Sequence, residues 1–395
     1  MTISTKQWQY ALFTLFLVPG LSLSTWISRT PNIRDTLLAS TSLMGWIIFG
    51  LACGSLIGLL TANRLIGRLG TKSVIAMCLF VICIGLATIG ISSTFFKSAL
   101  LVFLSLVFFG FGFGMIEVAI NVEGASLEHA MSKTLLPALH GAFSAGTLLG
   151  AGIGYLAILL NIATIVHFLL IALLGLLLLV IYIGKIPSHN GKTDQSENVD
   201  CQDEKVNVWK EKRTILIGLL VLGMAFAEGS ANEWLPMTIV DGFNVEDHVG
   251  TAVYTIFLFA MLIGRLAGGN ILDRFGRVPV IRFATLVAAC GICMLVFVKS
   301  LLIGVIGVFL WGLGASLGFP VGLSAAGDEP KNTTQRVGAV SVLGYLAFLV
   351  GPPFLGILGE AVGLLRAMIA VLITLLLVSF LTPAVKKTIT HGITK

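Results

Sequence analysis

The chain has 395 residues, of which 56% are apolar and only 11% are charged, and its mean hydropathy is +0.99. A soluble globular protein carries about 25% charged residues, so this composition excludes a soluble domain or a soluble enzyme. The formal charge of +6 at pH 7 does not indicate a nucleic-acid partner, because membrane proteins retain Lys and Arg in their cytoplasmic loops.

Long apolar stretches follow one another along the whole chain. Each is close to the roughly 20 residues that are needed to cross a hydrocarbon core about 30 Å thick. The sequence predicts twelve of them, at residues 8–29, 43–63, 74–91, 98–122, 136–159, 162–183, 214–238, 250–271, 278–298, 301–324, 336–358 and 362–384. We therefore expect an all-α integral membrane fold of twelve transmembrane helices, embedded in the lipid bilayer.

One polar, charged segment interrupts the apolar pattern, between Pro187 and Arg213. Its Ser, Asn, Asp and Lys residues are typical of a flexible linker. The predicted organisation is an N-terminal six-helix bundle over residues 1–186, a cytoplasmic linker over 187–213, and a C-terminal six-helix bundle over 214–395.

The cations are distributed unequally between the two sides of the predicted membrane. With the N-terminus inside, 20 of the 25 Lys and Arg residues fall in cytoplasmic segments and helix ends, Arg265 among them. Cytoplasmic loops carry this excess in membrane proteins. The pattern predicts that both termini are cytoplasmic, as expected for a multi-pass protein of the bacterial inner membrane.

The two halves of the chain carry a related sequence between their second and third spans. Three pairs coincide at an offset of 206 residues: Gly58 with Gly264, Arg68 with Arg274, and Gly70 with Gly276. A second match, of Gly110-Phe-Gly112 with Gly312-Leu-Gly314, lies at an offset of 202. Two matches at nearly one offset, in equivalent positions, indicate an internal repeat and two pseudo-symmetric bundles.

The turn Asp273-Arg274-Phe275-Gly276-Arg277 resembles the cytoplasmic loop motif of the major facilitator superfamily. The first-half copy departs from it, since Gly67 stands where Asp273 stands in the repeat. The resemblance implies a gating role for the residues that make up the two copies. These are Gly58, Asn63, Arg64, Arg68, Gly70, Gly264, Asp273, Arg274 and Gly276. We expect Asp273 to contact an arginine or a helix N-terminus of a neighbouring span.

Acidic residues inside a membrane span are the most informative candidates, because a charged residue at a helix centre costs about 2.5–3.5 kcal/mol on insertion scales. The sequence places Glu117, Glu228 and Glu233 inside spans and away from loops. Glu117 and Asn121 are four residues apart and share a helix face. This pair resembles a segment of the fucose-permease-like branch of the superfamily, in which the acid is a proton site.

Burial of Glu117 would favour its protonated form, and His140 could join it in a proton relay. The alternative is a glutamate that holds helices together by hydrogen bonds. We predict that Glu117, Asn121 and His140 form the proton-coupling group.

Glu228 and Asn232 repeat the same spacing in the seventh span. The family resemblance implies that the first, fourth, seventh and tenth spans line the solute pathway. The predicted substrate-binding residues are therefore Trp26, Arg29, Glu228, Asn232, Trp234 and Trp311. For the tryptophans the alternative is aromatic packing, and for Arg29 it is a cation at a helix end that reaches water.

These observations predict a secondary transporter that moves a small polar organic solute by alternating access. We expect it to be a proton-coupled symporter that acts as a monomer. A proton-driven exporter of drugs or metabolites is the alternative, and a membrane receptor or scaffold is a further one. No GxxxxGK[ST] loop occurs, so ATP drive is not expected. Cys290 and Cys293 form a CxxC pair inside an apolar run with no second pair, and we predict no metal, no cofactor and no enzymatic activity.

Overall fold

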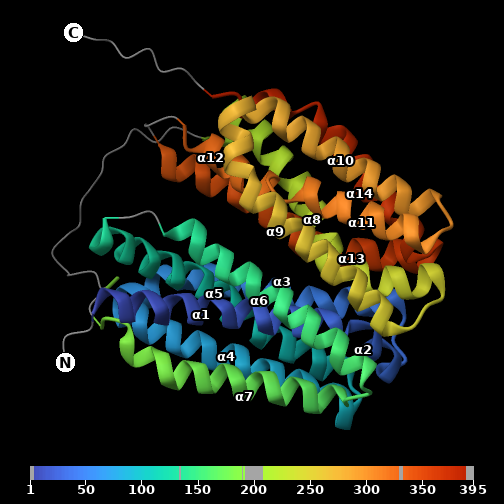
Figure 1. Cartoon of the computed structure of the whole chain (residues 1–395), viewed down its shortest axis with the longest axis horizontal. Coiled ribbons are helices and arrows are strands. Elements are labelled where there is room, and N and C mark those ends of the chain that lie inside the picture. The colour runs from blue at the N-terminus through green and yellow to red at the C-terminus, as the bar shows by residue number, and fades with distance from the viewer. Residues whose placement is uncertain (1–3, 133–134, 189, 192–207, 329–331, 388–395) are drawn as a thin grey trace. The chain divides into compact units, whose positions relative to one another are not determined.

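The computed structural model describes residues 4–132, 135–188, 190–191, 208–328 and 332–387. Over these residues the chain folds into helices joined by short connections, without β-strands (Figure 1). Eleven helical stretches are long and apolar enough to cross a membrane, and α14 (Leu364–Ser379) is a shorter apolar helix. The predicted all-α fold with twelve spans is confirmed.

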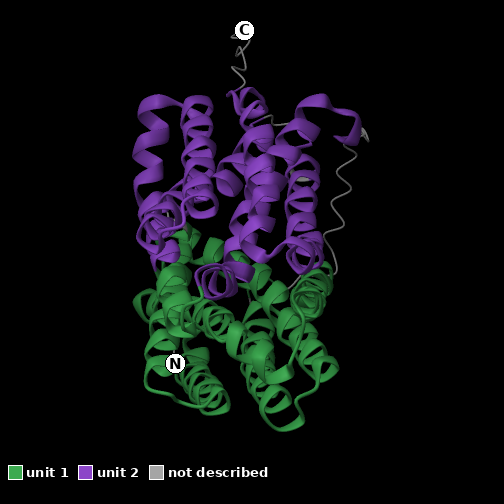
Figure 2. Ribbon diagram, turned by 90° about the vertical axis from the view of Figure 1, so that its right-hand side faces the viewer, with its two compact units in different colours: residues 1–198, 244–255 green, residues 199–243, 256–395 purple. Residues whose placement is uncertain are grey.

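The chain divides into two compact units, coloured separately in Figure 2. Unit 1 contains residues 1–198 together with 244–255. Its helices are α1 (Thr5–Ser28), α2 (Thr30–Leu37), α3 (Thr41–Leu69), α4 (Thr71–Ile91), α5 (Ala99–Met131), α6 (Leu136–Leu159) and α7 (Thr164–Tyr182). The most extensive packing joins α3 to α5, α1 to α6, and α4 to both α5 and α7.

Unit 2 contains residues 199–243 and 256–395. Its helices are α8 (Lys212–Phe243), the greater part of α9 (Asp247–Phe275), α10 (Arg277–Phe297), α11 (Leu301–Ala315), α12 (Gly318–Ala326), α13 (Thr333–Val362) and α14. The most extensive packing joins α10 to α11, α8 to α13, and α14 to both α8 and α10.

The same helix pairs pack in both units, as the predicted repeat requires. The packing of α1 on α6 corresponds to that of α8 on α13, and the packing of α4 on α5 to that of α10 on α11. The turn after the second span of each unit also repeats: Gly70 has φ 82° and ψ 158°, and Gly276 has φ 79° and ψ 164°. Since L-residues with a Cβ rarely adopt positive φ, glycine at both positions lets the chain reverse directly into the next helix.

Close helix contacts are repeated as well. A Cβ on Gly58 would lie 2.2 Å from the carbonyl oxygen of Phe111, and a Cβ on Gly110 would lie 2.2 Å from that of Leu51. In unit 2, a Cβ on Gly312 would lie 2.6 Å from the carbonyl oxygen of Phe257. Small residues at these points let neighbouring membrane helices approach each other closely.

Three features differ from the prediction. The short helix α2 follows the first span, α5 continues to Met131 instead of ending near residue 122, and the tenth span is divided into α11 and α12. The division has a sequence cause, because Pro320 has no N–H to donate to Ser316 and its ring crowds that carbonyl group. The expected boundaries of the bundles and linker stay predictions, and residues 189 and 192–207 of the linker lie outside the described part.

Candidate functional site

An ion pair lies inside the membrane helices of unit 2. Nη2 of Arg265, on α9, donates a hydrogen bond to Oε1 of Glu228, on α8, over 2.8 Å. Glu228 is near the middle of α8, and Arg265 lies ten residues before the end of α9 at Phe275. At 1.5 Å per residue this places Arg265 about 15 Å from that end, so the sequence analysis was wrong to count it among cytoplasmic helix ends.

Neither member of the pair is fully buried among the described residues. The exposed fraction of the side chain is 35% for Arg265 and 16% for Glu228. On α9 the next residue, Leu266, is 72% exposed. Arg265 projects in a different direction, toward α8, where Glu228 accepts its hydrogen bond.

Polar residues mark one side of α8 around the ion pair. From Gly223 to Ile239 every residue of α8 is buried except Glu228, Asn232 and Glu233. Glu228 and Asn232 are four residues apart and therefore lie on one face of the helix, as predicted. This part of the helix is therefore buried except at three polar residues, one of which is the acid of the ion pair.

The break in the tenth span lies beside this ion pair. A Cβ on Gly264 would lie 2.2 Å from Oγ of Ser316, and a Cβ on Gly268 would lie 2.3 Å from Cδ2 of Leu317. Ser316 and Leu317 are the residues between α11 and α12. Gly264, the residue next to Arg265 on α9, therefore packs against the interruption between α11 and α12.

In unit 1, the structure brings together two of the three predicted proton-coupling residues. Nε2 of His140, on α6, lies 3.0 Å from Oδ1 of Asn121, on α5, so that the ring N–H can donate to the amide oxygen. Nδ2 of Asn121 donates to the backbone carbonyl of Glu117 over 2.7 Å. The His140 ring also meets Phe16 edge-on, with centroids 5.6 Å apart.

The carboxyl group of Glu117 was expected to be buried, but the residue is exposed in the structure. The fully buried acid of α5 is Glu123, with an exposed fraction of 0%. Its carboxyl group accepts hydrogen bonds from the hydroxyl of Thr71 and from Nδ2 of Asn190, the latter over 3.0 Å. The apolar stretch in the sequence ends at residue 122, one residue before Glu123, so this acid was not among the predicted site residues.

Arg29 belongs to a separate polar cluster in unit 1. It is buried, with an exposed fraction of 4%, and its guanidinium donates to Asn32, to Nδ1 of His167 and to the carbonyl of Ile162. Asn32 in turn donates to Asp247, at the start of α9. These hydrogen bonds hold the Arg29 guanidinium to other residues of unit 1, and its predicted role in binding substrate stays a prediction.

The three tryptophans that were predicted to stack on substrate are also occupied by packing. Trp26 is 1% exposed, and Trp234 and Trp311 are 0% exposed. Trp311 packs edge-on against Phe257, with ring centroids 5.7 Å apart. A ligand cannot reach these rings without a change of conformation, so here they are core residues.

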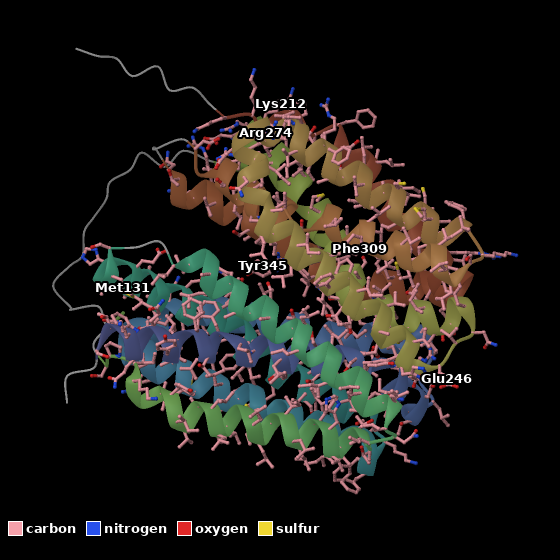
Figure 3. The ribbon with its side chains drawn as sticks, viewed as in Figure 1. Met131, Lys212, Glu246, Arg274, Phe309 and Tyr345 are labelled. Atoms are coloured by element: carbon pink, nitrogen blue, oxygen red, sulfur yellow. The ribbon has the colours of Figure 1, made fainter. Side chains whose placement is uncertain are left out.

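The predicted gating residues fall into two groups. Gly58, Gly70, Gly264 and Gly276 serve close packing and turns, as described above. Asn63, Arg64, Arg68, Asp273 and Arg274 are exposed, and Figure 3 labels Arg274 near the end of α9. The contact that was expected for Asp273 is absent among the described residues.

The acid that binds arginines at this end of unit 2 is Asp328. Nη1 of Arg277 lies 2.8 Å from both oxygens of Asp328, and Nη2 of Arg213 lies 3.1 Å from one of them. The sequence does not indicate this cluster, because Asp328 lies far from the loop motif in the chain.

Comparisons with known proteins agree with this architecture. The family model of the Major Facilitator Superfamily matches residues 10–246 and 217–391. An uncharacterised transporter of Sinorhizobium fredii is 29% identical over 372 residues, which cover 90% of this chain and 95% of that protein. An uncharacterised transporter of the same superfamily from Yersinia pestis is 27% identical, with 94% of each chain covered.

Solved structures of transporters share the fold. The nucleoside transporter NupG superposes with a TM-score of 0.73 at 14% identity, covering 98% of this chain and 99% of its own. The Escherichia coli fucose:proton symporter FucP superposes with a TM-score of 0.66 at 16% identity, covering 96% and 98%. At these identities the likeness concerns the fold alone.

Proposed function

The chain belongs to the Major Facilitator Superfamily, and on that premise we propose that it carries a small polar organic solute together with protons, as a symporter that works by alternating access. Membership of the family supports secondary transport of a solute across a membrane. Proton coupling and the direction of transport are the parts that we add.

The observation that carries the proposal is the position of Glu117. It is an exposed acid inside the membrane helix α5, one turn from Asn121, which is hydrogen-bonded to His140. An ionisable residue at such a depth is costly, and a carboxyl group that water can reach is able to load and release a proton. A carboxyl group that stayed sealed in the bundle, as Glu123 is, would exchange its proton with neither side.

The cycle that we propose uses one acid for coupling and another for substrate. Protonation of Glu117 removes a charge that opposes closure of the pathway, and loss of the proton on the other side restores it. Glu228 and Asn232 of α8 contact the solute. A proton and a solute that favour the same occluded state are coupled through that state, without direct contact.

The orientation and location are part of the same proposal. We place both termini and the linker in the cytoplasm, and the protein in the bacterial inner membrane, because of the unequal distribution of cations. The protein acts as a monomer built from two six-helix bundles.

The test begins with a thermal-shift screen of the purified protein against sugars, organic acids, amino acids and drugs, because a ligand of the folded state raises its apparent stability. The solute identified is then assayed in proteoliposomes with and without an imposed pH gradient. Glu117→Gln mimics the protonated acid, so it should retain exchange of solute but lose accumulation against a gradient. Glu246→Gln, which changes an exposed acid outside the helices, is the matched control.

The proposal fails if the Glu117→Gln protein accumulates solute against its gradient as well as the parent does. It also fails if the parent shows no difference between the two pH conditions. Proton-driven exit of the solute, instead of entry, would identify the exporter that the sequence left as an alternative.

A further inference from the structure

From the contacts at the start of α9 we infer that Asp247 and Thr251 form a latch, which holds the pathway closed at that end of the protein and opens once in each transport cycle. This inference rests on the alternating access of the proposed function, but it requires neither proton coupling nor a particular solute. It depends on the unit with which the start of α9 packs, on its polar contacts there and on the continuity of the helix.

The start of α9 packs with unit 1, although its sequence belongs to the second copy of the repeat. The repeat aligns α9 with α3, through Gly264 and Gly58. All of α3 lies in unit 1, whereas α9 is divided: residues 247–255 belong to unit 1 and residues 256–275 to unit 2, as the colours of Figure 2 show. The two copies of this helix therefore differ at the beginning of α9.

Two hydrogen bonds hold the start of α9 to the junction of α1 and α2. The hydroxyl of the buried residue Thr251 donates to the backbone carbonyl of Ser28, the last residue of α1, over 3.0 Å. One turn earlier on α9, the carboxylate of Asp247 accepts a hydrogen bond from Nδ2 of Asn32, on α2. These two bonds and the four residues that form them make up the latch.

The receiving side of the latch is fixed within unit 1. Nη1 of Arg29 donates to the side-chain oxygen of Asn32 over 3.3 Å. The same guanidinium is anchored on Nδ1 of His167, over 3.3 Å, and on the carbonyl of Ile162, over 2.7 Å. Because Arg29 binds the oxygen of the Asn32 amide, the nitrogen of that amide is directed to Asp247. Arg29 is thus a positioning residue for the latch.

The continuity of α9 makes these bonds sensitive to movement of unit 2. The helix runs unbroken from Asp247 to Phe275, and its sequence contains no glycine or proline between Thr251 and Gly264, where it passes from one unit to the other. Sharp kinks in helices arise mostly at proline, at glycine and serine pairs or where a group inserts. When alternating access moves unit 2 relative to unit 1, the start of α9 therefore moves with the rest of the helix, and both bonds of the latch break.

The strength of the two bonds suits a contact that opens and closes. A neutral hydrogen bond changes an equilibrium by about 2- to 10-fold, and one to a charged group by about 10- to 100-fold. The bond of Thr251 is of the first kind and the bond of Asp247 is of the second. Together they favour the closed state at this end without making it permanent.

The test measures the distance between the two units at each end. Spin labels are attached in pairs to the full-length protein, after its six native cysteines have been replaced by alanine. Lys97→Cys with Lys299→Cys, after the third span of each half, reports the end at which α9 begins. Leu69→Cys with Phe275→Cys reports the end at which α9 finishes, and all four positions are exposed. Double electron–electron resonance gives the distance distribution of each pair.

The hydroxyl of Thr251 is tested by a substitution of nearly equal size. Thr251→Val should change the ratio of open to closed molecules by about 2- to 10-fold, so the first pair of labels moves apart and the second moves together. Thr251→Ser restores the hydroxyl and should restore the distribution of the labelled parent. Thr255→Val is the matched control, because the hydroxyl of Thr255 donates to the carbonyl of Thr251 within α9, over 2.9 Å.

The carboxylate of Asp247 is tested in the same way. Asp247→Ala should shift the ratio in the same direction by about 10- to 100-fold. Asp247→Asn keeps an oxygen that can accept from Asn32, so its shift should be smaller. Glu246→Ala, which removes the neighbouring exposed acid, should leave both distributions as they are in the labelled parent.

Two results would overturn the inference. One is that the double variant Asp247→Ala with Thr251→Val gives the distributions of the labelled parent. The other is that one pair of labels moves while the other does not, because a local loss of structure would produce no opposite change at the far end. Opposite changes at the two ends, combined with solute accumulation that is independent of the pH gradient, would keep the latch and remove proton coupling. Proton-driven accumulation with distances that ignore both substitutions would do the reverse.

Discussion

Replacing Gly58 by alanine tests the account of how α3 and α5 pack. A Cβ at this position would lie 2.2 Å from the carbonyl oxygen of Phe111 and 2.8 Å from the backbone nitrogen of Met115. Carbon–oxygen contacts in proteins are about 3.3–3.6 Å, so α3 would have to move away from α5 by roughly 1 Å. Both obstacles are backbone atoms, which cannot rotate aside as a side chain can.

The sign of the effect follows from two opposing contributions. Alanine favours a helix over glycine by about 1 kcal/mol, whereas overpacking of a well-packed core costs about 1–3 kcal/mol. Because the obstruction is backbone, we expect the upper part of that range and a net destabilisation of about 1–2 kcal/mol. The variant should unfold at a lower temperature than the parent in the same detergent.

Gly152→Ala is the matched control, since a Cβ at Gly152 would meet nothing within 4 Å. It should be neutral or stabilising by up to about 1 kcal/mol, from helix propensity alone. The thermal stability of the two variants is measured by heat denaturation. Unfolding is followed both by intrinsic fluorescence and by loss of the monodisperse peak in size-exclusion chromatography. If Gly58→Ala were as stable as Gly152→Ala, the close contact of α3 with α5 would be refuted.

Two further predictions concern ionic contacts near helix ends. The pKa of Glu211 lies below its ordinary value near 4.5, because Arg336 donates hydrogen bonds to both of its carboxylate oxygens, at 2.6 and 2.8 Å. A lowered pKa contributes stability that is present above the unfolded-state pKa and is lost as the pH falls through the folded-state pKa. Glu211→Gln should therefore lower the denaturation temperature at pH 7, and the difference from the parent should shrink as the pH falls below 4.5 and vanish once it is below the lowered pKa of Glu211; a difference that did not shrink in acid would contradict the assignment. Asp247→Ala removes the acceptor of the Asn32 hydrogen bond and the acid in the first turn of α9, so backbone amides of that turn should exchange hydrogen faster, by roughly 10-fold or more for a charge-assisted bond. Glu246→Ala is its control, and equal exchange in both variants would count against a stabilising role for Asp247.

Most of the fold could be predicted from hydropathy, because each span needs a long apolar stretch and the bilayer fixes its length. The importance of four glycines could be predicted as well, because the internal repeat aligns Gly58 with Gly264 and Gly70 with Gly276. Their roles in close contacts and positive φ are what the structure adds.

The polar contacts could be predicted less well, because they join residues far apart in the chain. The four-residue spacing of Glu228 and Asn232 indicated a shared face, but nothing in the spacing pointed to Arg265 as the partner on α9. Hydropathy also places helix ends poorly, since a helix can continue beyond its apolar part. That error excluded Glu123 from α5 and put Arg265 at a helix end.

The tryptophans, which were predicted to stack on substrate, are buried in the structure. An aromatic residue in a span suits a ligand stack and a packed core equally well, and the sequence contains no feature that separates the two. Arg29 is a similar case, because a cation at a helix end can be solvated or, as here, enclosed by Asn32, His167 and a backbone carbonyl.

Symport requires that solute and protons cross the membrane together. Proton movement measured during transport therefore distinguishes symport from uncoupled transport. Proteoliposomes containing the parent protein are suspended in weakly buffered medium, and the solute identified by thermal shift is added outside while the external pH is recorded. The account predicts alkalinisation of the medium on addition of solute to the parent, and none with Glu117→Gln. Solute entry without any change of pH in the parent, or acidification of the medium, would contradict it.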